Sequence, residues 1–351
     1  MVKLINKNLF TMEGDVLVIG GGAAGMETAS RLSGFNRNVI LIEKERELGG
    51  HILKWDRLFP DGILASEVTK NLKETLGRTT VLLERVITSI EKKEDSFFIA
   101  QLNSGERIKC NAVVFATGFK LFPAQKKQEY GYGLYERVIT NADLETRFKE
   151  FKGLGKEAPR KVGFVHCVGS RDEKACNIQC SKICCITAVK QAIELKELYP
   201  DAEIFCFYMD LRMYGRGYED LYLEAQSKFG IRFIRGRVSE ISEDMSGLVI
   251  VKAEDTLSSR PLKITMDWVV LMAGIVSDRE NDHLTQQLSI QLGEDGFIDS
   301  VDPILKTNHT NISGVFVTGS ATGPKTLPDV INESRSTALA VNDYLTQIKN
   351  G

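Results

Sequence analysis

The sequence predicts an α/β fold made of two dinucleotide-binding, Rossmann-like domains. Near the start, an apolar run, a glycine-rich turn, a helical pattern and a second apolar run follow one another. The same order of patterns returns after residue 160. The chain has 351 residues, which exceeds one ordinary domain and is enough for two large cores.

The first domain is expected to be discontinuous, formed by residues 1–155 and 280–351. It begins with a strand at 15–19, a helix through Leu32 and a strand at 38–42. Residues 81–91 and 96–102 alternate as an antiparallel excursion would, and a buried strand is expected at 111–115. A strand at 314–318 and a closing helix at 332–344 return to this domain.

The second domain is expected at residues 156–279. Its pattern is a strand at 161–166, a segment rich in cysteine, a helix at 188–198 and a strand at 202–209. Further strands are expected at 231–234, 248–253 and 267–272. The repeated order of elements predicts a second Rossmann-like unit.

Composition excludes several classes of protein. Hydrophobic residues make up 43% and charged residues 26%, and the net charge is only −2, so neither disorder nor nucleic-acid binding is indicated. The first residues lack an apolar signal core, and the longest apolar stretch, 268–276, is about half a membrane span. We therefore expect a cytoplasmic protein without membrane insertion.

The first turn has the spacing of a phosphate-binding turn. Gly20 allows a tight turn, Gly22 lets backbone N–H groups reach a pyrophosphate, and Gly25 lets helix and strand pack closely. Glu43 ends the second strand, where a carboxylate accepts hydrogen bonds from a ribose. The alternative is a fortuitous glycine turn with a solvated acidic residue.

Three later motifs resemble the flavin-binding motifs of the flavoprotein family with two dinucleotide folds, which includes thioredoxin reductase. They are residues 47–51, 116–118 and 314–320. The resemblance implies FAD, an adenine contact through the backbone of Val86, and a ribityl and pyrophosphate contact near Gly319. Ser320 replaces the usual Asp, so a hydroxyl must serve there. The residues expected to bind FAD are Gly20, Gly22, Ala24, Gly25, Glu43, Lys44, Gly50, His51, Val86, Ala116, Thr117, Gly118, Gly319 and Ser320.

The second domain carries cysteines where a second glycine-rich turn would lie. Gly169 is the single glycine of residues 167–172, so this turn cannot cradle a pyrophosphate in the usual way. Four thiolates are the ligand set of a [4Fe-4S] cluster, and two of them, Cys180 and Cys184, are one helical turn apart. The expected ligands are Cys167, Cys180, Cys184 and Cys185.

Other readings of the cysteines stay open. They are structural zinc, and buried or redox-active thiols including a vicinal disulfide. Cys176 is either a spare ligand or an exposed or structural thiol, whereas Cys110 and Cys206 are expected to be buried. His166 adjoins the first ligand, and its expected role is packing in a strand.

Taken together, the chain resembles one family, that of the A subunit of heterodisulfide reductase. The resemblance implies that electrons pass from FAD to a nearby [4Fe-4S] cluster and on to partner subunits. It also implies that Lys190 lies near the flavin N5, whereas the alternative for Lys190 is a solvated helix charge. The matching stretches are residues 16–25, 43–60, 115–122, 130–141, 164–190, 204–217, 233–238 and 314–328.

Within that family, the chain resembles the short versions found with sulfur-oxidising complexes, because the added ferredoxin-like segments of methanogen members are absent. The preferred function is that of an electron-transfer subunit, which is an oxidoreductase subunit that is not self-sufficient. It is expected to work with other heterodisulfide-reductase-like subunits. The chain itself is expected to form a homodimer. One alternative is a free-standing NAD(P)H-dependent disulfide reductase. Another is a non-catalytic scaffold with structural zinc and a vestigial FAD.

Overall fold

The computed structural model describes residues 11–93, 97–150, 154 and 158–350. The chain divides into two compact units. The first comprises the described residues of Met1–Ile52, Val68–Lys120 and Ser277–Gly351, and the second comprises those of Leu53–Glu67 and Leu121–Val276. The predicted boundary at residues 155 and 156 lies outside the described residues. Residues 121–150, which were assigned to the first domain, lie in the second unit.

The first unit contains the expected helices and strands in the expected order, with four further elements among them, at residues 11–13, 65–74, 107–110 and 282–287. The helices and strands are β1 (Thr11–Glu13), β2 (Val16–Ile19), α1 (Ala23–Gly34), β3 (Val39–Ile42), α2 (Ala65–Glu74), β4 (Thr80–Leu82), β5 (Ile87–Lys92), β6 (Phe98–Leu102), β7 (Arg107–Cys110), β8 (Ala112–Phe115), α6 (Asp282–Gln287), β19 (Val315–Val317) and α7 (Leu327–Asn350). The chain passes between the units in β9 (Phe119–Leu121) and β18 (Ile275–Ser277), and α2 starts in the second unit.

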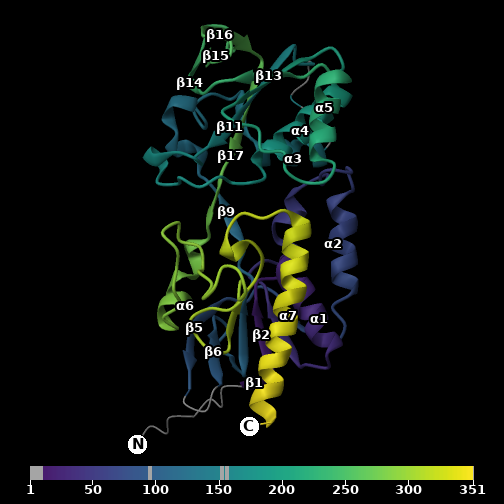
Figure 1. Cartoon of the computed structure of the whole chain (residues 1–351), viewed down its shortest axis with the longest axis vertical. Helices are drawn as coiled ribbons and strands as arrows, with labels where there is room; N and C mark the ends of the chain where they lie inside the picture. Colours follow the sequence, from purple (N-terminus) through teal and green to yellow (C-terminus); the bar gives the residue numbers. More distant parts are fainter. Residues whose placement is uncertain (1–10, 94–96, 151–153, 155–157, 351) are drawn as a thin grey trace, which may run out of the picture. The chain divides into compact units, whose positions relative to one another are not determined.

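A five-stranded parallel sheet forms the centre of the first unit. Its order is β19-β8-β2-β3-β4. Strands β2, β3 and β8 are completely apolar and buried, as parallel strands covered on both faces must be. Figure 1 shows α7 and α1 beside this sheet, and these two helices pack against each other. Strands β5, β6 and β7 form the antiparallel excursion, with β1 added parallel to β7.

One expected strand is divided in two. Residues 81–91 were predicted as a single antiparallel strand, but residues 81–82 belong to β4, which pairs parallel with β3, and β5 starts only at Ile87. Glu84 between them has a φ of 54°. This left-handed conformation turns the chain, so the two apolar runs enter different sheets.

The second unit repeats the parallel arrangement, with the sheet order β10-β17-β11-β12-β13. A separate antiparallel sheet contains β14, β15 and β16. The elements are β10 (Val138–Thr140), α3 (Asn141–Lys149), β11 (Lys161–Val168), α4 (Cys184–Leu198), β12 (Glu203–Tyr208), α5 (Tyr218–Ser227), β13 (Arg232–Arg235), β14 (Val238–Glu243), β15 (Val249–Asp255), β16 (Arg260–Met266) and β17 (Trp268–Ala273). Among the described residues, no helix is both long and apolar enough to span a bilayer.

Candidate functional site

The glycine turn after β2 is open on the side of Gly22. This residue is the N-cap of α1, and no side chain caps the helix there. A Cβ on Gly22 would meet no atom within 4 Å, whereas a Cβ on Gly25 would lie 1.8 Å from the Gly20 carbonyl oxygen. The turn therefore combines tight packing with N–H groups at a helix start that an anion can approach.

Glu43 holds this turn through its carboxylate. Its Oε2 accepts a hydrogen bond from the Gly21 N–H at 2.7 Å, and its Oε1 accepts one from the Glu45 N–H at 2.9 Å. The side chain is buried, so the alternative of a solvated acidic residue is wrong. A carboxylate has about four acceptor positions, so Glu43 can still accept bonds from ribose hydroxyls.

The motif at residues 47–51 packs on the same turn. The Gly49 N–H donates to the Gly21 carbonyl oxygen at 2.9 Å, and a Cβ on Gly50 would lie 3.1 Å from the Gly22 Cα. His51 is placed by Phe119, whose ring it stacks on at 4.1 Å and whose carbonyl oxygen lies 2.8 Å from its Nε2.

The motifs at residues 116–118 and 319–320 also reach the turn. A Cβ on Gly20 would lie 2.5 Å from the carbonyl oxygen of Ala116, and a Cβ on Gly319 would lie 2.6 Å from the Cβ of Ala24. Ser320, the departure from the usual Asp, is buried. The structure thus brings together sequence motifs that lie far apart along the chain.

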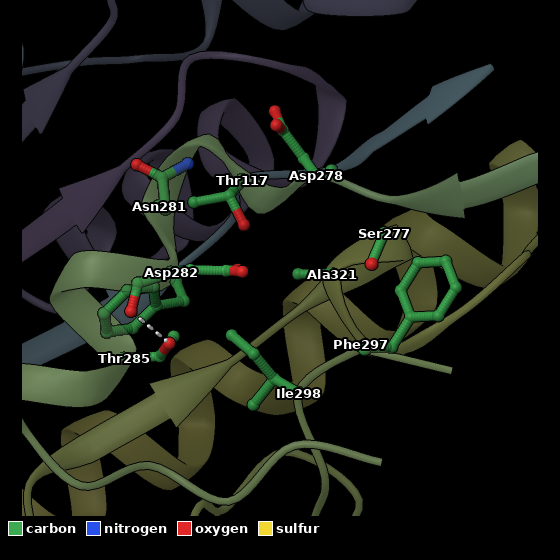
Figure 2. A pocket seen from close by; sticks show the side chains of 12 residues that line it. Thr117, Ser277, Asp278, Asn281, Asp282, Thr285, Phe297, Ile298 and Ala321 are labelled. Carbon is green, nitrogen blue, oxygen red and sulfur yellow. Dashed lines mark hydrogen bonds between the residues drawn. The ribbon is translucent and has the colours of Figure 1, made fainter. Parts of the chain in front are cut away.

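A pocket in the first unit adjoins two of these motifs. Figure 2 shows Thr117 and Ala321 at its wall, together with Ser277, Asp278 and Asp282. The Thr285 hydroxyl donates to the Asp282 carbonyl oxygen at 2.9 Å. Two carboxylates repel a phosphate, so this pocket is better suited to a group that donates hydrogen bonds.

Lys44 makes ion pairs within the protein. Its Nζ pairs with Glu280 and lies 3.9 Å from Asp278. Lys120 lies 2.8 Å from Glu280, and the hydrogen bonds from Lys120 and Lys44 lower the pKa of Glu280 to about 2. The predicted role of Lys44 at the cofactor is untested, and its ammonium already has partners.

Val86 lies between β4 and β5 with its backbone already paired. Its N–H donates to the Asn103 side-chain oxygen at 3.2 Å, and its carbonyl oxygen accepts from the Asn103 N–H at 2.9 Å. Since the carbonyl oxygen has a second lone pair, it is the group left for the predicted adenine contact.

The cysteine segment begins at a bulge in β11. The register of this strand shifts between Val165 and Val168, and Cys167 within the bulge has a φ of 58°. A bulge changes the direction of a side chain. Helix α4 starts only at Cys184, so the prediction that Cys180 and Cys184 share a helical turn was wrong: Cys180 precedes the helix in a loop.

Three of the thiols contact one another. Cys184 makes side-chain hydrogen bonds with Cys167 and Cys185. These bonds raise the pKa of Cys184, with burial adding to the effect, and the bond to Cys184 lowers the pKa of both Cys167 and Cys185. Sequence positions 167, 184 and 185 therefore meet at one place in the second unit.

Arg171, which is paired with Asp210, interacts both with the group of three thiols and with Cys180. The guanidinium of Arg171 lies 2.7 Å from the Asp210 carboxylate, and it interacts electrostatically with Cys167 and Cys180. The Cys185 thiol donates to the Asp210 carbonyl oxygen at 3.7 Å. In the part of the chain that the structure describes, no three His, Cys, Asp or Glu side chains are arranged as a ready metal site. The donor set itself, four thiols from two segments, fits soft metal chemistry.

The remaining cysteines match their predicted environments. Cys110 and Cys206 are buried, and burial raises the pKa of Cys110 to about 12. Cys176 is exposed. His166 is buried in β11, and neither of its ring nitrogens has a hydrogen-bond partner among the described residues. Burial opposes protonation of the ring, but the neighbouring Cys185 and Cys206 favour it and raise the pKa of His166 to about 10.

The turn after β11 differs from the turn after β2 in its free space. A Cβ on Gly169 would lie 2.1 Å from the ring of Phe122. A Cβ on Gly22, in the turn after β2, would meet no atom within 4 Å. An aromatic ring thus covers the glycine of the second turn.

Lys190 is buried in α4, so its alternative as a solvated helix charge is wrong. Its Nζ lies 2.6 Å from Glu145 and 3.0 Å from Glu194. Gln191 also donates to Glu145, at 2.8 Å. These contacts lie within the second unit, and the predicted place of Lys190 beside a flavin remains a prediction.

The acidic partners of Lys190 and of Lys44 were not predicted from the sequence. Glu194 could have been found, because it follows Lys190 by four positions on a helix. Glu145 could not, because 45 positions separate it from Lys190. The same holds for the pairing of Lys44 with Glu280 across 236 positions.

Comparison with known proteins supports the two-domain fold. Residues 14–150 match the family model described as pyridine nucleotide-disulphide oxidoreductase. The thioredoxin reductase of T. acidophilum superposes with a TM-score of 0.67 at 19% identity, covering 94% of this chain and 98% of that one. The Lactococcus lactis thioredoxin reductase gives 0.66 at 17% identity, covering 95% and 99%. The predicted fold class is confirmed.

Relatives with curated names indicate the family more specifically. The iron-sulfur A subunit of CoB–CoM heterodisulfide reductase from Methanocaldococcus jannaschii is 29% identical over 98% of this chain and 66% of its own length. The corresponding iron-sulfur subunit from Methanopyrus kandleri is 40% identical over 69% of this chain and 38% of its own length. The expected resemblance is confirmed, and the chain spans between 38% and 66% of the length of these two relatives.

Proposed function

We infer that this chain is an electron-transfer subunit of a heterodisulfide-reductase-like complex. The reason is that it is a relative of the A subunit of heterodisulfide reductase. It binds FAD in the first unit and a [4Fe-4S] cluster in the second. It is an oxidoreductase subunit that depends on partner subunits. The complex belongs to sulfur metabolism in the cytoplasm, and the chain forms a homodimer there.

The binding of FAD is supported by the turn after β2. Gly22 leaves space for a pyrophosphate, α1 has no side-chain cap, and Glu43 offers a carboxylate to a ribose. A 2'-phosphate would be repelled by Glu43, which favours FAD over phosphorylated dinucleotides. FAD supplies the two-electron and one-electron redox chemistry of the subunit.

The cluster is supported by one observation above all, which is the convergence of Cys167, Cys184 and Cys185 beside Arg171. Cys180 interacts with the same arginine. Thiolates select iron-sulfur clusters, zinc or copper(I) over hard cations. Cys184 and Cys185 are adjacent in the chain, which suits a cluster with separate irons better than one tetrahedral zinc.

The deciding experiment measures iron, sulfide, zinc and FAD in anaerobically purified protein, with EPR after reduction by dithionite. We expect a [4Fe-4S] signal, about four irons and one FAD per chain. Zinc in place of iron would support the alternative function, that of a non-catalytic scaffold with structural zinc. Intact FAD without any metal would contradict the cluster and would favour redox-active thiols at Cys184 and Cys185.

Single variants then test the ligand assignment. Cys184→Ala removes the thiol that bonds to two others, so iron is lost while FAD is retained. Cys110→Ala is the matched control, because this buried cysteine lies in the first unit and should leave iron unchanged. Full iron content in Cys184→Ala would show the assignment to be wrong. Cys176→Ser determines whether the exposed thiol is a further ligand.

A further inference from the structure

The guanidinium of Arg171 carries a buried nitrogen that its ion pair does not use. One nitrogen, Nη2, lies 2.7 Å from the Asp210 carboxylate. The other, Nη1, is buried and has no hydrogen-bond partner among the described residues. Buried N–H donors in proteins normally have an acceptor, because leaving one unpaired costs free energy. Nη1 is therefore free to donate to an acceptor that a bound cofactor brings.

Hydrogen bonds connect Arg171 to both segments that carry the cysteines. Its backbone N–H donates to the carbonyl oxygen of Gln179 at 3.1 Å, directly before Cys180 in the chain. Asp210, which pairs with the guanidinium, accepts a hydrogen bond from the Cys185 thiol on its own carbonyl oxygen at 3.7 Å. The charge of Arg171 also interacts with two of the four predicted ligands. The guanidinium therefore belongs to the surroundings of the cysteine site.

A cation at this place changes the free energy of cluster reduction. Four thiolates make an iron-sulfur cluster negative, and an electron from the FAD adds one more negative charge. A nearby cation favours the reduced form, and it acts strongly here because the side chain of Arg171 is only 23% exposed. A guanidinium stays protonated in proteins, so its charge acts without the uptake or release of a proton.

We propose that Arg171 sets the reduction potential of the cluster that the cysteine segment binds, and that Asp210 limits its effect. This inference rests on the proposed function, because it requires the cluster. The guanidinium raises the potential by its charge, and Nη1 supplies an N–H donor to sulfur. The Asp210 carboxylate lowers the potential to a smaller extent, because its side chain is 48% exposed and solvent screens its charge.

The test is the midpoint potential of the cluster in anaerobically purified holoprotein, measured by EPR during a redox titration with dithionite. Arg171→Gln should lower the equilibrium constant for reduction at least about tenfold, which is about 59 mV for a one-electron couple. Arg171→Lys keeps the charge and should lie closer to the wild type. Asp210→Asn should raise the equilibrium constant by about threefold, since it removes an exposed negative charge but keeps the carbonyl group that Cys185 contacts.

The matched control is Arg232→Gln in β13 of the same unit. Arg232 also pairs with a carboxylate, that of Glu203 at 2.8 Å, but its side chain is 61% exposed. In addition, β13 is an edge strand that β12 separates from β11. This variant should change the equilibrium constant for reduction by less than about twofold.

Three outcomes contradict the role of Arg171. They are an unchanged potential in Arg171→Gln, an equal shift in Arg232→Gln, and a shift to more negative potential in Asp210→Asn. The last of these decides the matter even where Arg171→Gln assembles no cluster. The iron content of the wild type separates this proposal from the proposed function. Iron-loaded wild type with any of the three outcomes overturns the role of Arg171 alone, whereas iron-free wild type overturns the cluster and this role together.

Discussion

The ammonium of Lys190 lies 2.6 Å from the Glu145 carboxylate, and both side chains are almost fully buried. Glu194 lies 3.0 Å from the same ammonium. Two carboxylates around one cation leave an excess of negative charge in an interior where charges are costly. Lys190 therefore joins α3 and α4 and offsets the charge of two acidic residues.

Replacing Lys190 by Met should destabilise the second unit by about 3–5 kcal/mol, because Glu145 loses its buried counter-ion. Both tryptophans, Trp55 and Trp268, belong to this unit, so tryptophan fluorescence during urea unfolding reports on it directly. The double variant Lys190→Met with Glu145→Gln should regain part of the loss, since the unpaired charge is removed.

The control is Lys228→Met, which removes the exposed partner of Glu224 in the same unit. Its unfolding midpoint should stay close to that of the wild type. Equal midpoints for Lys190→Met and the wild type would show that the buried ion pairs contribute no net stability.

Glu194 should make stability depend on pH. Burial raises the pKa of Glu194 to about 7, although the charge of Lys190 opposes this. The folded state therefore holds a proton that the unfolded state has released, between the ordinary pKa near 4.5 and about 7. Stability falls as pH rises through this window, by up to about 3 kcal/mol.

Glu194→Gln should remove that dependence, because the amide does not titrate. Urea unfolding followed by tryptophan fluorescence at pH 5, 6, 7 and 8 gives the comparison. The variant should gain most over the wild type at pH 8. Parallel curves for the two proteins would show that Glu194 does not titrate in this range.

The arrangement of the parallel sheets was predictable from local patterns. Strands β2, β3 and β8 are short apolar runs, and the glycine turn fixes where α1 starts. The division of residues 81–91 was not predictable, because it depends on the left-handed conformation of a non-glycine residue, Glu84. Neither was the start of α4 at Cys184, since no capping side chain marks it.

Site residues were predictable where the backbone can accommodate only one residue type. Gly22 and Gly25 are examples, because free space and close approach both require glycine. Partners from distant segments were not predictable, as Lys44 and Lys190 show. Their carboxylate partners are brought close by tertiary packing, and a local sequence pattern does not predict contacts between distant segments.

Reduced nicotinamide cofactors alone should not bleach the flavin of the purified protein. The ring of Phe122 covers Gly169, where a second pyrophosphate would need to approach the turn. The measurement is the visible flavin absorbance after anaerobic addition of NADH or NADPH, with dithionite as the positive control. Rapid bleaching by either nucleotide would favour the free-standing disulfide reductase.

Gly22→Val should abolish FAD binding without unfolding the protein. Gly22 has a φ of −74° and a ψ of −171°, which any residue adopts, and a Cβ there meets no protein atom. The added side chain would instead fill the space in which a pyrophosphate approaches α1. Flavin absorbance after gel filtration measures FAD content, and circular dichroism checks the fold.

Two other glycines of α1 make this prediction specific. Gly34→Val also adds a side chain in open space, but at the far end of the helix, so FAD should be retained in full. Gly25→Ala should instead fail to fold normally, because its Cβ would lie 1.8 Å from the Gly20 carbonyl oxygen. If Gly22→Val kept one FAD per chain, the cofactor could not lie against this turn, and the dinucleotide site would have to be sought elsewhere in the unit.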